Sequence, residues 1–374
     1  MKFIALTENL KKAVNLAERI TGKNLTLPIL NNLLLETNKN KIHLLATDLE
    51  LGIEITITGK TEKEGKFVLP AKTFSAFLNN LPEEKISLEK KDNTLSVFGG
   101  KYNSVFQGMN PEDFPIIPEI KTEKFIELEK NDLEEALEQI IPSISYSSLK
   151  PELNGVLLKL ENGILKIVGT DSFRLAEKTI FNDKFKTNIK EDLEIIIPLR
   201  SSQELLRIIQ EQIEEDSTKI KINPEINQVQ FSTENIRLIS RLINAEYPKY
   251  ASIIPKNFEI NIIFDKKDLL EAVKVVGLFS GRINDIHFNI SPDKKEVVIE
   301  AQDISLGKSH ATINPLEIKG KNLEINFNYR FILDSLNSIR EEMVIINLNN
   351  ELNPGLVKGK NDNSFIYILM PIKV

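Results

Sequence analysis

Three segments of the chain share one pattern: a short apolar stretch, a polar break, and then apolar residues at helical spacing. They span residues 3–20, 125–141 and 260–276. Asn9, Asp132 and Asp268 stand just before the first helical leucine, where Asn and Asp favour a helix N-terminus. The apolar positions that follow recur every three or four residues and so fall on one helical face. The pattern predicts an amphipathic helix in each segment.

A second helical pattern follows in each copy, at residues 69–82, 197–210 and 327–339. Pro70 and Pro198 suit the first turn of two of these helices, and Asn328 takes that place in the third. The residues between the paired helices alternate or carry β-branched side chains, as in sheets that are covered on one face. These stretches end at Asp48, Asp171 and Asp303. Landmarks that recur about 120 residues apart indicate an internal repeat.

A chain of 374 residues is too long for one ordinary core. Each copy follows the order helix, strands, helix, strands, which predicts an α+β fold of three repeated domains. Proline-bearing stretches at 114–124 and 247–257 mark the links between the copies. We therefore expect domains at residues 1–121, 122–250 and 251–374. The repeat alone also allows three duplicated domains with unrelated roles.

The composition is that of a soluble globular protein, with 41% hydrophobic and 27% charged residues. No apolar run approaches the roughly 20 residues that a membrane span needs. The N-terminal sequence has no apolar core with a small-residue cleavage site, so we expect no export signal. The absence of cysteine excludes disulfides, thiolate metal sites and thiol nucleophiles. These features predict a cytoplasmic protein that does not contact the membrane.

The chain is poor in groups suited to catalysis. Its histidines are His43, His287 and His310. It contains no phosphate-binding loop, dinucleotide fingerprint, nucleophile elbow or HExxH motif. Asp171 could be a catalytic carboxylate, but Asp48 and Asp303 hold the same place in the other copies, and a repeated aspartate is more often a turn former. We expect no catalytic residue, no metal site and no cofactor.

The net charge of −6 argues against nucleic-acid binding only if the charges are evenly spread. Basic residues stand on the polar faces of the predicted helices: Lys11, Lys12, Arg19, Lys23, Lys72, Arg200, Arg207, Lys266, Lys267, Lys274, Arg330 and Arg340. Glu134, Glu135 and Glu138 interrupt this series. The pattern fits either an ordinary solvated helix face or a basic surface that the helices line together.

The chain ends in an apolar strand, SFIYILMPIKV, which leaves Met370, Pro371 and Ile372 near a terminus. Such a segment either packs at a sheet edge or forms one wall of an apolar pocket for a partner peptide. The residues alone leave both interpretations open.

Short motifs in a fixed order connect the chain to a known family. They are TLPILNNLLLE from Thr26, ATDLELGI from Ala46, LPAKTF from Leu69, NPEDFP from Asn110, LNGVLLKL from Leu153, GTDSFRLA from Gly169, YPKY from Tyr247, and the terminal LMPIKV. From Met1 to Val374 the chain resembles the bacterial DNA sliding clamp, the β subunit of DNA polymerase III. The resemblance implies a head-to-tail homodimeric ring, with helices lining the central hole and antiparallel sheets outside. It also implies a non-catalytic processivity factor of DNA replication.

The resemblance implies sequence-independent contacts between double-stranded DNA and residues in the hole. The candidates are Lys23, Asn24, Lys72, Ser147, Lys150, Arg200 and Lys266. Two departures from the family pattern affect this set. Asn24 stands where relatives often have arginine, and the loop before Leu153 lacks the aromatic residues that some members carry.

The resemblance also implies a partner pocket between the second and third domains. Its candidate residues are Leu153, Thr170, Phe173, Arg174, Leu175, Pro248, Ile253, Met370, Pro371 and Ile372. Expected partners are the DNA polymerase III α subunit, the clamp loader and other proteins with a clamp-binding peptide, with Arg174 able to bond that peptide. Phe173 and Ser252 depart from the family pattern, and the alternative is that the set merely packs the domain junction. The candidates for the dimer interface are Phe77, Phe106, Leu278 and Phe279.

Two other functions remain as alternatives. A multi-domain scaffold that binds only proteins would show no salt-sensitive association with DNA. An enzyme with an unrecognised site would be detected by an assay for phosphodiester or nucleotide hydrolysis. We expect the clamp to act in the cytoplasm, in association with the nucleoid.

Overall fold

The computed structural model describes residues 1–22, 26–146, 150–211 and 217–373. The chain forms two compact units. The first unit comprises Met1–Glu134, Asp183–Glu191 and Arg200–Ile243, and the second comprises Glu135–Asn182, Asp192–Leu199 and Asn244–Val374. The second copy of the repeat therefore contributes residues to both units.

The first unit holds a five-stranded and a nine-stranded antiparallel sheet, with the orders β5-β1-β7-β8-β9 and β14-β10-β16-β17-β18-β4-β3-β2-β6. The strands are β1 (Lys2–Leu6), β2 (Asn32–Asn38), β3 (Lys41–Thr47), β4 (Leu51–Thr58), β5 (Lys60–Lys63), β6 (Gly65–Pro70), β7 (Lys85–Lys91), β8 (Thr94–Gly99), β9 (Tyr102–Gln107), β10 (Ile126–Glu129), β14 (Phe185–Thr187), β16 (Lys219–Pro224), β17 (Gln228–Ser232) and β18 (Ile236–Arg241). The larger sheet joins two copies of the repeat, because β18 of the second copy pairs with β4 of the first.

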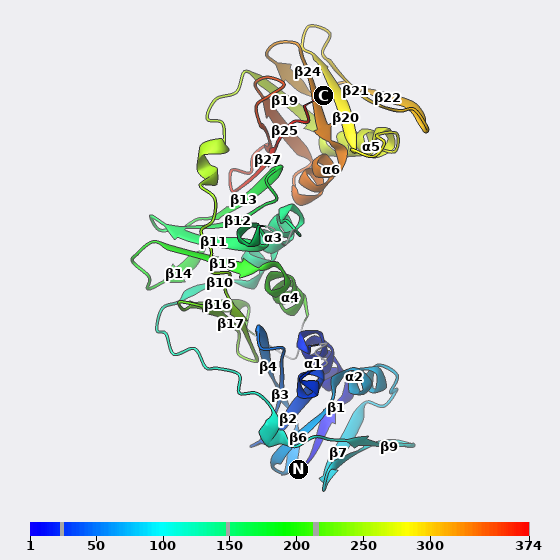
Figure 1. Ribbon diagram of the computed structural model, residues 1–374, viewed down its shortest axis with the longest axis vertical. Coiled ribbons are helices and arrows are strands. Elements are labelled where there is room, and N and C mark those ends of the chain that lie inside the picture. Colours follow the sequence, from blue (N-terminus) through cyan, green and yellow to red (C-terminus); the bar gives the residue numbers. More distant parts are fainter. Residues whose placement is uncertain (23–25, 147–149, 212–216, 374) are drawn as a thin grey trace. The chain divides into compact units, whose positions relative to one another are not determined.

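The helices of the first unit bury the predicted apolar face. They are α1 (Thr7–Ile20), α2 (Ala71–Asn79) and α4 (Leu199–Gln210), the last beginning one residue before this unit resumes. Helices α1 and α2 lie side by side (Figure 1), and α1 packs on β3 and β4. Leu10, Val14 and Ala17 of α1 are fully buried, which confirms the predicted stripe.

The second unit holds a nine-stranded and a four-stranded antiparallel sheet, with the orders β15-β11-β12-β13-β27-β26-β25-β19-β23 and β22-β21-β20-β24. The strands are β11 (Gly155–Glu161), β12 (Ile164–Thr170), β13 (Arg174–Ile180), β15 (Leu193–Pro198), β19 (Ile260–Asp265), β20 (Asp285–Ser291), β21 (Glu296–Asp303), β22 (Gly307–Ile313), β23 (Glu317–Lys319), β24 (Leu323–Asn328), β25 (Met343–Leu348), β26 (Gly355–Gly359) and β27 (Phe365–Leu369). Here β13 of the second copy pairs with β27 of the third.

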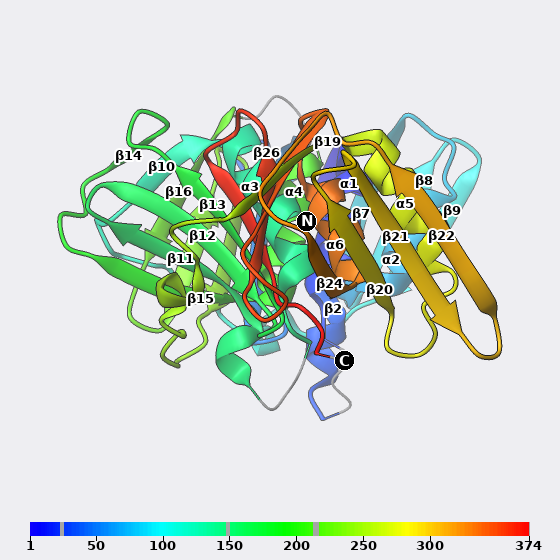
Figure 2. The ribbon, with the colours of Figure 1, turned by 90° about the horizontal axis from the view of Figure 1, so that it is seen from above.

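The helices that follow the same pattern in the second and third copies are α3 (Lys130–Ile140), α5 (Lys266–Gly277) and α6 (Tyr329–Ser338). Helix α5 packs on β21 and β22, whose broad arrows lie next to one another in Figure 2. Leu269, Val273 and Val276 form its fully buried stripe, as the period predicts.

The predicted helix starts need a correction. Helices α1, α3 and α5 begin two residues before Asn9, Asp132 and Asp268. The residue that caps α5 is Asp265, whose carboxylate accepts hydrogen bonds from the backbone N–H groups of Lys267 and Asp268. Asp268 lies in the first turn instead, where a negative charge also suits the helix dipole. An aspartate therefore does cap α5, but it stands three residues earlier than the apolar period predicts.

The strand pairing between the first two copies carries a partly buried ion network. Glu54 on β4 accepts hydrogen bonds from Arg237 on β18 and approaches Nδ1 of His43 on β3 at 3.3 Å. The hydrogen bond from His43 and the charge and hydrogen bonds of Arg237 lower the pKa of Glu54 to about 2, although burial opposes them. The ionised carboxylate therefore stabilises the junction of β4 and β18.

We expect Glu54→Gln to reduce stability at pH 6 and to matter little near pH 2. A carboxyl whose pKa is depressed stabilises the fold above its ordinary pKa of 4.5, and this contribution disappears as the pH falls towards about 2. The shift corresponds to at most about 3 kcal/mol. Urea unfolding at pH 6, 4 and 2.5 measures it. Glu50→Gln is the control, because Glu50 pairs with Arg241 on the open surface; an equal effect of both variants would contradict the assignment.

Candidate functional site

The same aspartate turn recurs in all three copies. The Oδ1 atom of Asp48 accepts hydrogen bonds from the N–H groups of Glu50 and Leu51 at 3.0 and 2.8 Å. Asp171 does so with Phe173 and Arg174 at 2.9 and 3.0 Å, and Asp303 with Ser305 and Leu306 at 2.8 and 3.2 Å. In each copy the carboxylate closes the turn after a sheet strand. Each aspartate therefore forms the turn that the repeat predicts.

Each of these turns displays an apolar side chain. The exposed residues are Leu49 in the first copy, Phe173 in the second and Ile304 in the third. Only Phe173 was predicted as a site residue. Leu49 and Ile304 directly follow the turn aspartate, where the second copy has Ser172, whereas Phe173 stands one residue later, so alignment of the turns does not single them out. Each of the three turns thus exposes an apolar side chain, and the residues around that side chain determine what it can contact.

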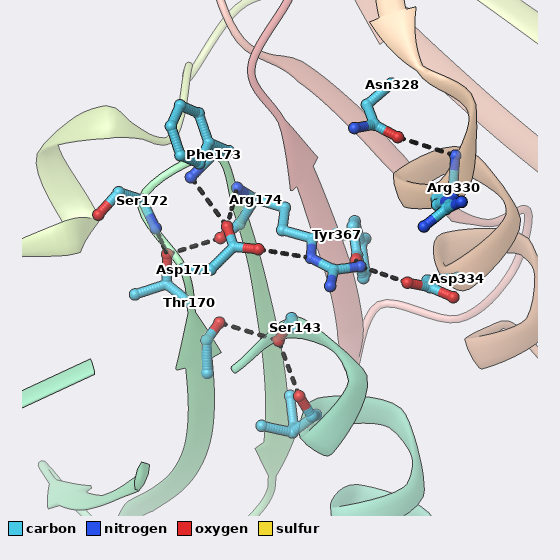
Figure 3. A network of polar contacts seen from close by, with 12 residues as sticks. Ser143, Thr170, Asp171, Ser172, Phe173, Arg174, Asn328, Arg330, Asp334 and Tyr367 are labelled. Atoms are coloured by element: carbon cyan, nitrogen blue, oxygen red, sulfur yellow. Dashed lines mark hydrogen bonds and ion pairs between the residues drawn. The ribbon is translucent and has the colours of Figure 1, made fainter. Parts of the chain in front are cut away.

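At the turn of the second copy, Arg174 lies at the centre of a polar network (Figure 3). Its Nε donates to Oδ2 of Asp171 at 2.9 Å, and its Nη1 contacts the hydroxyl of Tyr367 at 3.2 Å. The same Nη1 forms an ion pair with Asp334 of α6. The guanidinium also lies over the ring of Phe331, 4.3 Å from its centroid. Arg174 therefore fastens the turn of the second copy to α6 and β27 of the third.

Burial by itself would lower the pKa of Arg174, but Tyr367, Asp334 and Asp171 reverse this and hold it above its ordinary value. Burial also raises the pKa of Tyr367, so that its hydroxyl stays neutral. The guanidinium is thus always charged and engaged inside the protein. This arrangement favours a positioning role for Arg174 beneath the exposed Phe173, beside the peptide-binding role that the sequence predicts.

The other predicted pocket residues fall into three groups. Leu153, Thr170 and Leu175 are buried; Phe173, Pro248 and Ile253 are exposed; Met370, Pro371 and Ile372 are half-buried. The terminal segment lies against the Asp171 turn, because the N–H of Met370 donates to the carbonyl of Phe173 at 2.9 Å. The N–H of Ile372 donates to the carbonyl of Asn326 at 2.8 Å. Backbone hydrogen bonds therefore place Met370 beside Phe173.

The link between the second and third copies is held against β13. The hydroxyl of Tyr250 donates to Oε2 of buried Glu177 at 2.6 Å, and Tyr247 packs edge-on against Tyr250. Burial and the Glu177 carboxylate raise the pKa of Tyr250. A short 3₁₀ turn, η5 (Tyr250–Ile253), is anchored in this way and presents Ile253. Thr170 is used differently, because its hydroxyl donates to the carbonyl of Arg174 at 2.6 Å within the turn.

Of the predicted DNA contacts, Lys23, Asn24 and Ser147 lie outside the described residues. Arg200 is half-exposed and forms an ion pair with Asp48. The Nζ atom of Lys266 donates to the carbonyl of Ile339 at 2.7 Å, and that of Lys150 donates to Ser172 Oγ at 3.2 Å. Lys72 is exposed on α2 and has no ion-pair partner among the described residues. Their role in DNA binding stays a prediction.

The predicted interface residues lie near two sheet edges. Phe106 on edge strand β9 packs edge-on against Phe77 of α2, with ring centroids 5.4 Å apart, and is itself buried. Leu278 follows α5 and is 70% exposed, with half-buried Phe279 beside it. Sequence reasoning missed further exposed apolar residues: Val275 of α5, Ile283 before β20, and Ile304 and Leu306 in the turn between β21 and β22, the strands on which α5 packs. Together with Leu278 they form what we call the α5 patch.

Two classes of site are not found in the described ranges. No helix there combines the length and apolar character needed to cross a bilayer. Within the same ranges, no group of three or more His, Asp or Glu residues is arranged to hold a metal ion.

Solved structures match the whole fold. The DNA polymerase sliding clamp of Bacillus subtilis superposes with a TM-score of 0.91 at 25% identity, covering 100% of this chain and 99% of that one. The DNA polymerase III β subunit of Thermotoga maritima gives the same values. The fold, with its repeated domains of helices on antiparallel sheets, defines the class of DNA sliding clamps, which confirms the predicted fold class.

Comparison of sequences identifies the family. The N-terminal, central and C-terminal domain models of the DNA polymerase III beta subunit match residues 1–118, 127–249 and 251–373. The "Beta sliding clamp" of Synechococcus elongatus is 28% identical over 382 residues, covering 100% of both chains. The chain belongs to the DNA polymerase III beta subunit family. It is a sliding clamp, and its role in DNA replication is to confer processivity.

We expect Arg174→Gln to destabilise the junction of the second and third copies by about 2–4 kcal/mol, because Asp171 and Tyr367 would be left without their buried partner. Arg200→Gln is the matched control, since Arg200 also bonds a turn aspartate but is half-exposed. Its removal should cost only about 0–1 kcal/mol. Urea unfolding of the full chain at pH 7 measures both. Equal shifts of the two midpoints would show that Arg174 is not a special anchor.

Proposed function

We propose that this clamp acts as a homodimeric ring that encircles duplex DNA and catalyses no reaction. The observation that supports the proposal is the strand order of the sheets. Each copy supplies a five-stranded part and a four-stranded part, and β4–β18 and β13–β27 join such parts into nine-stranded sheets. The four-stranded part that ends at β22 and the five-stranded part that ends at β9 remain separate. Pairing of β22 with β9 of a second molecule would make a third sheet of nine strands.

Head-to-tail pairing of this kind, made twice, closes a ring of two molecules. Apolar residues at both edges support it, because the exposed α5 patch adjoins β22, while β9 carries exposed Val105 beside buried Phe106. We assign Phe77, Phe106, Leu278 and Phe279 to this interface, with Ile304 and Leu306 added from the structure. We keep the three domains at residues 1–121, 122–250 and 251–374 as the units of the ring.

A ring retains DNA by topology, so phosphate contacts in the hole need only be weak and blind to sequence. We assign Lys23, Asn24, Lys72, Ser147, Lys150, Arg200 and Lys266 to the surface of the hole. The net charge of −6 is compatible with this, since binding depends on local charge. The protein would then act on the nucleoid.

The partner surface would be the apolar area around Phe173, Ile253 and Met370. A peptide with an apolar end, such as Leu-Phe, suits it, and buried Leu153 and Leu175 would form the floor. The partners we propose are the DNA polymerase III α subunit, the clamp loader and other proteins with such a peptide. Burial of one leucine and one phenylalanine could contribute roughly 1.5–3 kcal/mol each, which is compatible with micromolar affinity.

Retention on DNA tests the ring. The loaded clamp should stay on circular duplex DNA and leave the same DNA once it is linearised. Leu278→Asp should yield monomers that are retained on neither, because a charge would be buried in the interface. Leu352→Asp is the control, since Leu352 is similarly exposed but outside the α5 patch. Sedimentation gives the oligomeric state. Equal retention on linear and circular DNA would refute encirclement.

Peptide binding tests the pocket. Ile253→Ser should weaken a labelled peptide with a Leu-Phe end by about 5- to 30-fold, because few residues carry most of such binding energy. Ile226→Ser is the control, as Ile226 is 90% exposed on a turn of the first unit and is not among the proposed pocket residues. Fluorescence anisotropy measures both affinities. Deleting Met370 to Val374 should also reduce binding while the dimer remains, and unchanged affinity in Ile253→Ser and the truncation would remove both from the site.

A further inference from the structure

A polar cleft of about 250 Å³ lies inside the first unit, where α1 of the first copy meets α4 of the second. It is lined by Lys12, Asn15, Leu16, Arg19, Arg207, Gln210 and Glu211. We call this place the α1–α4 seam. None of these residues belongs to the DNA contacts assigned above, although three of them are basic.

Two arginines of the seam are fixed by one buried carboxylate. Glu204 is 8% exposed, and its Oε2 accepts a hydrogen bond from Nε of Arg19 at 3.2 Å. Its Oε1 accepts one from Nη1 of Arg207 at 2.5 Å. The arginine side chains are themselves 47% and 42% exposed. Each guanidinium has five N–H donors, so each keeps donors beyond the one that Glu204 occupies.

This geometry prepares the pair for an anion. Arginine on a flexible chain loses side-chain entropy when it binds, and a bond to a buried carboxylate removes much of that freedom in advance. The planar fork of a guanidinium also matches phosphate oxygens. Lys12, four residues from Glu8 on α1, adds a third cation to the same cleft. The seam therefore combines positive charge with fixed donors.

The corresponding seam in the second unit, between α3 and α6, has the opposite character. In the aligned repeats Glu135 stands where Lys12 does, and Glu138 where Asn15 does. Both carboxylates pair with Arg340, at 3.3 and 3.4 Å, and the position of Arg207 is taken by Asn337. The α3–α6 seam thus offers carboxylates where the α1–α4 seam offers arginines.

We infer that the α1–α4 seam is a binding site for backbone phosphates of duplex DNA, and that the α3–α6 seam is not. The inference rests on the proposed function, in which the helices face the DNA. Contacts would then be uneven around the ring, with one cationic seam in each molecule. Arginine bonded to phosphate reads no base sequence, so such a site holds the duplex without stopping it at particular sequences.

The test compares one arginine from each seam. Arg207→Gln and Arg340→Gln each remove one positive charge from an arginine that pairs with glutamate, with side chains 42% and 62% exposed. Binding of the dimeric clamp to a fluorescent linear duplex is measured by anisotropy over a series of salt concentrations. Arg207→Gln should weaken binding several-fold and reduce the slope of log affinity against log salt by up to about 0.9 for each phosphate that the variant no longer neutralises. Arg340→Gln should leave both unchanged.

A second variant guards against loss of structure. Lys12→Gln leaves the hydrogen bonds of Glu204 with Arg19 and Arg207 in place and should reduce the slope in the same direction, while circular dichroism verifies the fold of every variant. Equal slopes for wild type, Arg207→Gln and Lys12→Gln would overturn the seam as a phosphate site and leave the ring proposal intact. Wild type that fails to bind the duplex at any salt concentration would overturn the proposed function together with the seam.

Free inorganic phosphate could bind the seam through the same oxygen atoms as a DNA backbone phosphate. Inorganic phosphate titrated into the clamp without DNA, followed by calorimetry, should show no saturable binding below millimolar concentration. Tight binding that Arg207→Gln abolishes would assign the seam to a small anion and overturn its assignment to DNA.

Discussion

The open edge of a β-sheet carries unpaired N–H and C=O groups, and each copy of the repeat must have its edges covered. Inside the chain, the pairing of β4 with β18 and of β13 with β27 covers four of these edges by two continuous backbone ladders. The rest of the architecture depends on these ladders. They fuse successive copies into common sheets, set the distance between helices of neighbouring copies, and leave β9 and β22 as the ends of their sheets.

Backbone pairing joins any two strands of the right length, so the side chains at each junction are free to differ. The side chains at the two junctions do differ. The first junction carries Arg200 on Asp48 at a half-exposed position, whereas the second carries Arg174 between Asp171 and Asp334 in a buried one. The buried network fixes the turn that exposes Phe173. One inherited turn thus serves as a plain connection in one copy and as the support of an apolar surface in the next.

Helix packing leaves a similar freedom at the polar faces. Burial of Leu10, Val14 and Ala17 settles which side of α1 contacts the sheet, and nothing in that packing dictates the charges opposite. The copies therefore diverged there, to arginines on Glu204 in one seam and glutamates on Arg340 in the other. In the proposed ring this division would favour sliding, because uniform strong attraction around the hole would hinder movement.

The sequence by itself determined the features that depend on local periodicity and on its likeness to a family. The apolar stripes predicted the helices, the recurring aspartates predicted the turns, and the motifs from Thr26 to the terminal LMPIKV indicated the clamp family. Side-chain exposure was not determined in this way. Leu175 was expected in a pocket and is 1% exposed, whereas Ile304 was not singled out and is fully exposed.

Only the tertiary structure decided which distant residues meet. Arg19 and Glu204 are 185 positions apart, and Arg174 and Asp334 are 160 apart, so no local pattern links them. The same holds for the pairing of β4 with β18, because strand order depends on which edges meet in three dimensions. The sequence shows which helical residues are charged, but it does not show which residue each of them pairs with. The partner decides whether an arginine is a buried anchor or a group left to bind a ligand.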